Sequence, residues 1–115
     1  RLASNKDENP VVFQIKEYLH QNYAVPSLSV PDISEHVRLS PTYVCTLFKN
    51  ETGQTLNQYL TDYRIKMSKQ FLSDPLYKIT DISAKVGYSD GNYYSKAFRK
   101  IVGLSPSEYR EKMLR

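Results

Sequence analysis

The sequence has little of what metal and redox sites require. Its 115 residues include one cysteine, Cys45, and two histidines, His20 and His36, which lie sixteen residues apart. One cysteine excludes an internal disulfide, and the histidine spacing is not a metal-binding one. We therefore predict no metal site and no cofactor. We interpret Cys45 as a small side chain rather than a reactive thiol, because its own helical turn offers no cation to activate it.

Long apolar runs and catalytic motifs are also missing. No run approaches the roughly 18 to 20 apolar residues that span a bilayer, and no signal peptide opens the chain, so we expect a cytoplasmic protein. The sequence has no glycine-rich phosphate loop and no Ser/His/Asp or Cys/His set, which argues against an enzyme. No segment alternates apolar and polar residues with β-branched enrichment, which predicts an all-α fold.

The composition is that of a globular protein with an uneven charge. Hydrophobic residues make up 40% and charged residues 24% of the chain, and the net charge is +4. Residues 1–59 hold five Lys and Arg against six Asp and Glu, whereas residues 60–115 hold eleven against six. A basic C-terminal half is compatible with a polyanionic partner such as nucleic acid, although many proteins without one are equally basic.

Capping residues and helix-stop signals predict the helices. Asn, Ser or Thr precedes most of the expected helix starts, while Gly or Asp-Pro follows the ends. The predicted helices begin after caps at Asn9, Ser29, Ser40, Thr55 and Ser105, and two further ones cover residues 80–86 and about 92–102. In the first of them, apolar residues recur at helical spacing at Val12, Ile15, Leu19 and Tyr23.

The pattern is internally repeated. A shift of 49 residues matches Asp32, Ile33, Ser34, Val37 and Ser40 with Asp81, Ile82, Ser83, Val86 and Ser89. A shift of 50 then matches Tyr43, Phe48, Gly53 and Tyr59 with Tyr93, Phe98, Gly103 and Tyr109. Each copy reads as helix, tight turn, helix, which is the helix-turn-helix pattern. We therefore predict a tail at 1–9, helix-turn-helix subdomains at 10–54 and 75–115, and a linker helix at 55–74.

The second helix of each copy has two contrasting faces. Val44, Leu47 and Phe48 form an apolar stripe in the first copy, and Tyr94, Ala97 and Phe98 form one in the second. The opposite arcs are polar and basic, as a helix that enters the major groove of DNA requires. The candidates for base readout are Thr42, Cys45, Thr46, Asn92, Tyr93 and Lys96, and the candidates for phosphate contacts are Ser40, Lys49, Ser89, Arg99 and Lys100.

The linker helix supplies a spacing between the two copies. About 18 residues at ~1.5 Å rise span roughly 27 Å. With helix widths added, this separation is comparable with one duplex turn of ~34 Å. We therefore expect the recognition helices at 41–52 and 91–102 to enter successive major grooves of double-stranded promoter DNA.

These segments resemble a known family. The stretches "DISEHVRLSPTYVCTLFKNETGQTLNQYL" and "KITDISAKVGYSDGNYYSKAFRKIVGLSPSEYR" are similar to the DNA-binding domain of the AraC/XylS transcription regulators, over nearly all of residues 11–110. The resemblance implies about seven helices in two helix-turn-helix subdomains joined by a long linker helix. It also implies RNA polymerase as a second partner and a separate sensing or dimerisation domain outside this sequence, as in members that end response regulators.

The sequence departs from the family at two reading positions. A basic or amide residue is common in the family where this chain has Thr46, and Arg is common where it has Lys96. The first copy therefore reads bases either more weakly than the second or through methyl and hydroxyl contacts. Some members of the family insert only one recognition helix.

Two questions stay open at this stage. The alternative function is a helical protein-interaction or effector-binding domain with a basic face, but a docking helix would show a second apolar stripe, and neither recognition helix has one. Arg64, inside the linker helix, has two interpretations. One is an ion pair with a neighbouring helix; the other is a phosphate contact or a brace for the first subdomain.

Overall fold

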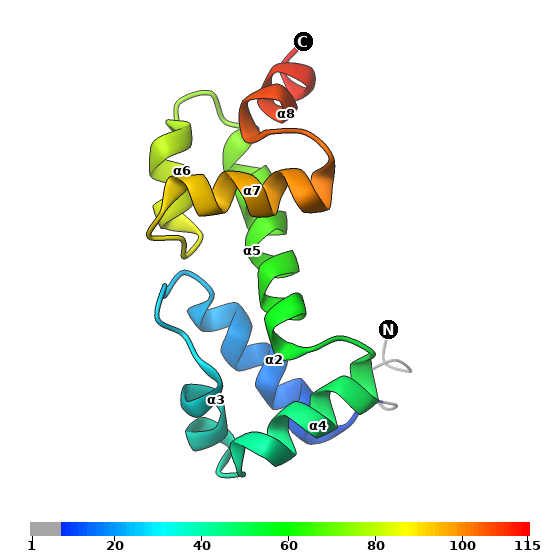
Figure 1. The fold of residues 1–115 in the computed structure, drawn as a ribbon. Coiled ribbons are helices and arrows are strands. Elements are labelled where there is room, and N and C mark those ends of the chain that lie inside the picture. Colours follow the sequence, from blue (N-terminus) through cyan, green and yellow to red (C-terminus); the bar gives the residue numbers. More distant parts are fainter. Residues whose placement is uncertain (1–7) are drawn as a thin grey trace. The chain divides into compact units, whose positions relative to one another are not determined.

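The computed structural model describes residues 8–115, and these residues form helices and connecting loops without a strand (Figure 1). The helices are α2 (Pro10–Asn22), α3 (Val30–Val37), α4 (Pro41–Thr52), α5 (Leu56–Leu72), α6 (Ile79–Lys85), α7 (Gly91–Val102) and α8 (Pro106–Met113). The predicted all-α fold with seven helices is therefore confirmed over the described residues. None of these helices has the length and apolar character needed to cross a bilayer.

Local capping chemistry fixes most helix ends. Asn9 accepts hydrogen bonds from the first backbone N–H groups of α2 through its side-chain oxygen. Thr55 and Gln58 exchange reciprocal side-chain and backbone hydrogen bonds of 3.0 and 2.9 Å at the start of α5. Ser105 and Glu108 do the same for α8, at 3.1 and 2.9 Å.

The chain divides into two compact units. Among the described residues, the first consists of residues 8–22 together with Leu28–Tyr59, and the second consists of Tyr23–Ser27 together with Leu60–Arg115. The loop after α2 therefore belongs to the second unit, and α5 contributes residues to both. The predicted division, with residues 55–74 as a separate linker helix, stays a prediction.

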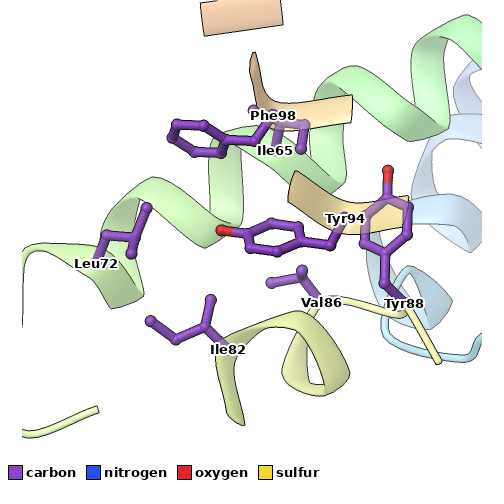
Figure 2. Packing of buried hydrophobic residues seen from close by; sticks show 7 residues of the cluster. All are labelled: Ile65, Leu72, Ile82, Val86, Tyr88, Tyr94 and Phe98. Atoms are coloured by element: carbon purple, nitrogen blue, oxygen red, sulfur yellow. The ribbon is translucent and has the colours of Figure 1, made fainter. Parts of the chain in front are cut away.

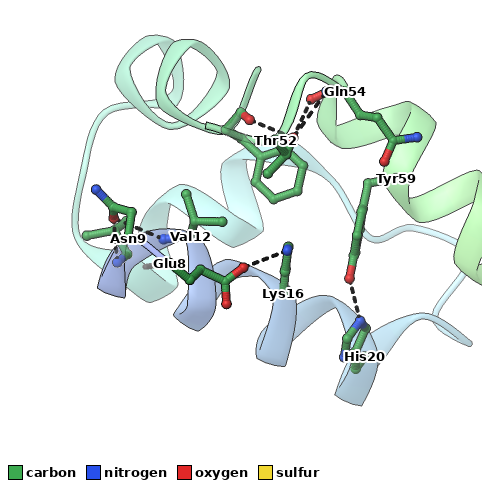
Figure 3. A network of polar contacts seen from close by, with 10 residues as sticks. Glu8, Asn9, Val12, Lys16, His20, Thr52, Gln54 and Tyr59 are labelled. Atoms are coloured by element: carbon green, nitrogen blue, oxygen red, sulfur yellow. Dashed lines mark hydrogen bonds and ion pairs between the residues drawn. The ribbon is translucent and has the colours of Figure 1, made fainter. Parts of the chain in front are cut away.

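The first unit packs α2, α3 and α4 around one core. Its buried residues come from each helix: Val12, Ile15, Leu19, Ile33, Val44, Phe48 and Leu56. Beside this core, Lys16 donates to Glu8 at 2.6 Å, and the His20 ring and the Tyr59 hydroxyl are hydrogen-bonded at 2.8 Å (Figure 3). The Thr52 hydroxyl donates to the carbonyl of Phe48 at 2.7 Å. These bonds tie the start of α2 and the turn after α4 to the unit.

The second unit has an aromatic-rich core. Its buried cluster joins α5, α6 and α7 through Ile65, Leu72, Ile82, Val86, Tyr88, Tyr94 and Phe98 (Figure 2). The Tyr94 hydroxyl is buried in this cluster and makes no hydrogen bond among the described residues. Burial raises the pKa of Tyr94, and the nearby Ser68 hydroxyl opposes that shift.

The structure differs from two local expectations. Tyr23 lies just after α2 rather than on its inward face, and it packs against the core of the second unit instead. The helix α7 begins at Gly91, with the Asp90 side chain accepting from the Asn92 N–H at 2.9 Å, so Asp90 rather than a serine is its cap. The serine cap of the first copy is therefore not repeated in the second.

Candidate DNA-binding site

The helix α4 has one buried face and one exposed face. Val44 and Phe48 are fully buried, and Leu47 is half-buried. Thr42, Cys45, Thr46 and Lys49 are all exposed. The predicted apolar stripe and the predicted polar arc therefore lie on opposite faces, as an amphipathic helix requires.

The helix α7 repeats this arrangement. Tyr94 and Phe98 are 1% and 0% exposed. Asn92, Tyr93, Lys96, Arg99 and Lys100 are exposed, and Tyr93 keeps 67% of its surface accessible. Three cationic side chains and an amide are thus exposed on the same helix as a large aromatic ring.

The N-terminal ends of the two helices are built differently. The Ser40 hydroxyl accepts a hydrogen bond of 3.1 Å from the Tyr43 N–H, which leaves its own proton to donate. Ser89 is exposed but does not cap α7, because Asp90 takes that role. At this end of α7 a carboxylate therefore lies beside the exposed Ser89 hydroxyl, whereas the cap of α4 is uncharged.

The C-terminal ends of the two helices carry the basic residues. Lys49 donates to the carbonyl of Gly53 at 3.2 Å, and Arg99 lies 3.7 Å from the Glu108 carboxylate. Both cations are mostly exposed, so these contacts are weak and exchangeable in water. Hydrogen bonds from the backbone and side chain of Ser105 lower the pKa of Glu108, with a smaller contribution from Arg99. All eleven candidate residues are thus exposed, and no group of His, Cys, Asp and Glu in the described chain could hold a metal ion.

Sequence reasoning singled out Arg64 but did not find its partners. Arg64 on α5 is 9% exposed, and it donates to the carbonyls of Tyr23 at 2.8 Å and Val25 at 2.9 Å. Gly87 and Tyr88, in the turn between α6 and α7, pack against this guanidinium. A shift of 49 aligns Gly87 and Tyr88 with Arg38 and Leu39, and neither pair indicates a contact with Arg64.

Two helix-turn-helix units with exposed polar and basic second helices define a DNA-binding domain of the helix-turn-helix class. The family model described as "Helix-turn-helix domain" matches residues 33–112. The chain belongs to this family, in its AraC-type branch of DNA-binding transcription regulators.

The relatives and a solved structure agree with this assignment. The chain is 36% identical over 110 residues to the Msm operon regulatory protein of Streptococcus mutans, covering 96% of this chain and 39% of the relative. It is 38% identical over 98 residues to the transcriptional regulatory protein HptR of Staphylococcus aureus, covering 85% and 38%. The C-terminal domain of AraT, a response regulator from Geobacillus stearothermophilus, superposes with a TM-score of 0.89 at 28% identity, covering 92% of this chain and 88% of that one. The chain thus spans about two fifths of the length of these curated relatives.

Proposed function

We propose that this chain binds double-stranded promoter DNA in a sequence-specific way, with α4 and α7 inserted into successive major grooves. The observation that supports this most strongly is the exposure of a polar arc on each helix opposite an apolar stripe, of which Val44, Phe48, Tyr94 and Phe98 are fully buried. An exposed helix face of this kind presents hydroxyls, an amide and cations, which are the groups that read base edges.

The two helices read bases by different chemistry. In α7, Lys96 donates to guanine O6 and N7, Asn92 pairs with adenine, and the exposed Tyr93 ring packs on a thymine methyl group. In α4, Thr42, Cys45 and Thr46 offer only methyl, thiol and hydroxyl groups. Because bidentate contacts discriminate best, α7 supplies most of the base discrimination.

The remaining candidates contact phosphates and fix the register of the protein on the duplex. Ser40 and Ser89 lie at the starts of the two helices, and Lys49, Arg99 and Lys100 lie towards their ends. Such contacts add affinity for any sequence. The length of α5, 17 residues or about 25 Å at 1.5 Å per residue, supports an engagement of two grooves by one chain.

The wider roles of the protein follow from the family. We propose that the chain is the DNA-binding part of a longer regulator that carries a sensing or dimerisation domain, that it contacts RNA polymerase, and that it has no catalytic step. The relatives support the first of these points, because the chain covers only 39% of one and 38% of the other.

Selection from a random duplex library tests the proposal. The chain should enrich one motif, and the enriched duplex should bind more tightly than a scrambled one at both 50 and 200 mM salt. Hydroxyl-radical footprinting should then protect two stretches about one helical turn apart on one face. Enrichment of no motif would refute sequence-specific binding, and protection of a single stretch would refute the engagement of two grooves.

Variants of two lysines in α7 distinguish sequence-specific base contacts from electrostatic attraction to any duplex. Lys96→Ala should weaken the selected duplex by ~1 to 3 kcal/mol and relax the preference at one base pair, whereas Lys100→Ala should weaken all duplexes alike. Competition gel shifts with single-base variants of the motif measure both effects. An unchanged preference in Lys96→Ala would show that the reading face of α7 is wrongly assigned.

A further inference from the structure

Arg64 is a buried cation in the middle of a helix, and its partners are backbone carbonyls. Its Nε atom donates to Tyr23 at 2.8 Å, and one terminal nitrogen donates to Val25 at 2.9 Å. The residue is 9% exposed, which leaves it little surface for a phosphate. Burial lowers the pKa of Arg64, and the neighbouring Tyr88 opposes that shift. The guanidinium nevertheless keeps its proton near neutral pH.

The same guanidinium forms one wall of the turn before the recognition helix. A Cβ atom added at Gly87 would lie 2.8 Å from the Arg64 Nε and 2.4 Å from the Tyr23 carbonyl oxygen, so the backbone of the turn passes directly over this hydrogen bond. The Arg64 guanidinium also lies 5.5 Å from the centre of the Tyr88 ring. A cation over a buried aromatic face is an attractive contact.

We call the contacts of Arg64 with the Tyr23 and Val25 carbonyls and with the turn at Gly87 the clamp. Tyr88 connects the clamp to the exposed polar arc of α7. Tyr88 is 7% exposed. Its ring packs edge-on against Tyr93, with ring centres 6.0 Å apart, and in a tilted arrangement against Tyr94, with ring centres 5.7 Å apart. Tyr94 anchors α7 in the core, whereas Tyr93 is exposed at the start of the polar arc. Arg64, Tyr88 and Tyr93 therefore form a continuous series of contacts from α5 to the first turn of α7.

We propose that Arg64 is a positioning residue for DNA recognition: it holds the turn at Gly87 and Tyr88 and thereby sets the orientation of the first turn of α7. It contacts no DNA itself. The effect on base preference rests on the proposed function, because it requires DNA binding. The orientation of α7 by Arg64 is a property of the protein without DNA. Removal of the clamp should lower specificity more than it lowers generic affinity.

The chain contains a matched control, because Arg110 makes the same kind of clamp elsewhere in the second unit. Its Nε atom donates to the Leu72 carbonyl at 2.9 Å and a terminal nitrogen donates to the Asp74 carbonyl at 3.1 Å. As with Arg64, the two carbonyls are two residues apart and follow the end of a helix. Arg110, however, contacts the end of α5 rather than the turn before α7.

The experiment compares Arg64→Lys with Arg110→Lys in the full chain. Lysine keeps the charge but lacks the planar fork that holds two carbonyls. Amide chemical shifts, measured without DNA, should change across residues 88–96 in Arg64→Lys and stay unchanged there in Arg110→Lys. With the selected and scrambled duplexes, Arg64→Lys should lower the affinity ratio about tenfold, the size of one lost base contact, while Arg110→Lys leaves the ratio unchanged.

The salt dependence of binding separates positioning from a phosphate contact. Loss of one phosphate contact reduces the slope of log K against log salt by about 0.9, whereas a positioning residue leaves the slope unchanged. Arg64→Met should therefore keep the wild-type slope. A reduced slope, or unchanged amide shifts at residues 88–96 in Arg64→Lys, would overturn the proposal.

A second variant covers the case in which the Arg64 variants do not fold. Tyr88→Leu keeps the two hydrogen bonds of Arg64 and a buried apolar side chain but removes the ring that contacts both the guanidinium and Tyr93. It should also shift the amides of residues 92–96 and lower the affinity ratio, and an unaltered ratio would refute the link. If the wild type itself prefers no duplex, the proposed function fails, while the shift experiment still decides whether Arg64 positions α7.

Discussion

Replacement of Gly87 by alanine should destabilise the second unit far more than the same change at Gly103. Both glycines have positive φ angles, +97° at Gly87 and +90° at Gly103. Alanine in this region costs about 1 to 2 kcal/mol. The gain from a less flexible unfolded chain is the same at both positions. The backbone conformation alone therefore predicts similar losses.

The surroundings of the two glycines make the difference. A Cβ at Gly103 would meet nothing within 4 Å, whereas a Cβ at Gly87 would lie 2.4 Å from the Tyr23 carbonyl oxygen and 2.8 Å from the Arg64 Nε. Both of these atoms must move apart from the new methyl group, which breaks the hydrogen bond of 2.8 Å that joins them. A hydrogen bond from a charged donor contributes about 1.5 to 3 kcal/mol. We therefore expect a loss of about 3 to 5 kcal/mol for Gly87→Ala and about 1 to 2 kcal/mol for Gly103→Ala.

Urea unfolding followed by far-ultraviolet circular dichroism measures both variants. Because both glycines lie in the second unit, the comparison concerns the same cooperative structure. The difference of about 2 to 3 kcal/mol corresponds to a midpoint temperature roughly 10 to 20 °C lower for Gly87→Ala in thermal melts. Equal losses in the two variants would refute the argument, since they would mean that the contacts at Gly87 add nothing to the cost of its backbone conformation.

Three further predictions address the reading face, the core and a helix cap. Cys45, the single thiol, is exposed on α4, so bound DNA should slow its alkylation by a maleimide, as followed by mass spectrometry; an unchanged rate would place α4 away from DNA. Tyr94→Phe removes a buried hydroxyl without a hydrogen bond and should leave the free energy of unfolding unchanged or raise it by up to about 1 kcal/mol in urea titrations; a clear loss would contradict this. Hydrogen bonds from Ser105 lower the pKa of Glu108 below its ordinary 4.5, so its stabilisation is present above pH 4.5 and is lost as the pH falls through the lower folded value. In Glu108→Gln, the fall of the melting temperature in acid should be shallower than in the wild type, and an identical profile would exclude this role.

The helix ends were predictable from sequence wherever the local chemistry is sufficient. Ser40 caps α4 through its side chain, and Gly53 ends it with a φ of +81°, because a serine hydroxyl and a glycine backbone act within their own turn. The predicted recognition helix at 91–102 agrees with α7, but the sequence did not name its cap. Ser89 and Asp90 are adjacent candidate caps. In the structure, Asp90 is the cap and Tyr88 just before them is buried, and this burial is a tertiary effect that the local sequence does not show.

The exposed faces were also predictable, since the 3.6-residue period places Lys96 opposite Tyr94 and Phe98. The contacts of Arg64 behind these faces were not predictable from the sequence. The partners of Arg64 are carbonyls 41 and 39 residues away in sequence. Every residue carries a carbonyl, so no residue type marks these partners, and the sequence left an ion pair, a phosphate contact and a brace equally open. In the structure, Arg64 donates to carbonyls of the loop that begins at Tyr23, which belongs to the second unit rather than to the first.

The two helix-turn-helix turns show why one contains a glycine and the other does not. In the second turn, the Gly87 N–H bonds to Ala84 and the Tyr88 N–H bonds to Ser83, at 3.2 and 2.9 Å. The residues 49 positions earlier make the same pair of bonds, at 3.3 and 3.1 Å, around Arg38, whose φ is +60°. A positive φ therefore does not by itself require glycine at this position, since the exposed Arg38 adopts it. Glycine is required at residue 87 because the guanidinium of Arg64 and a backbone carbonyl occupy the volume that a side chain would fill. This glycine is therefore explained by the contacts of Arg64 and not by the conformation of the turn.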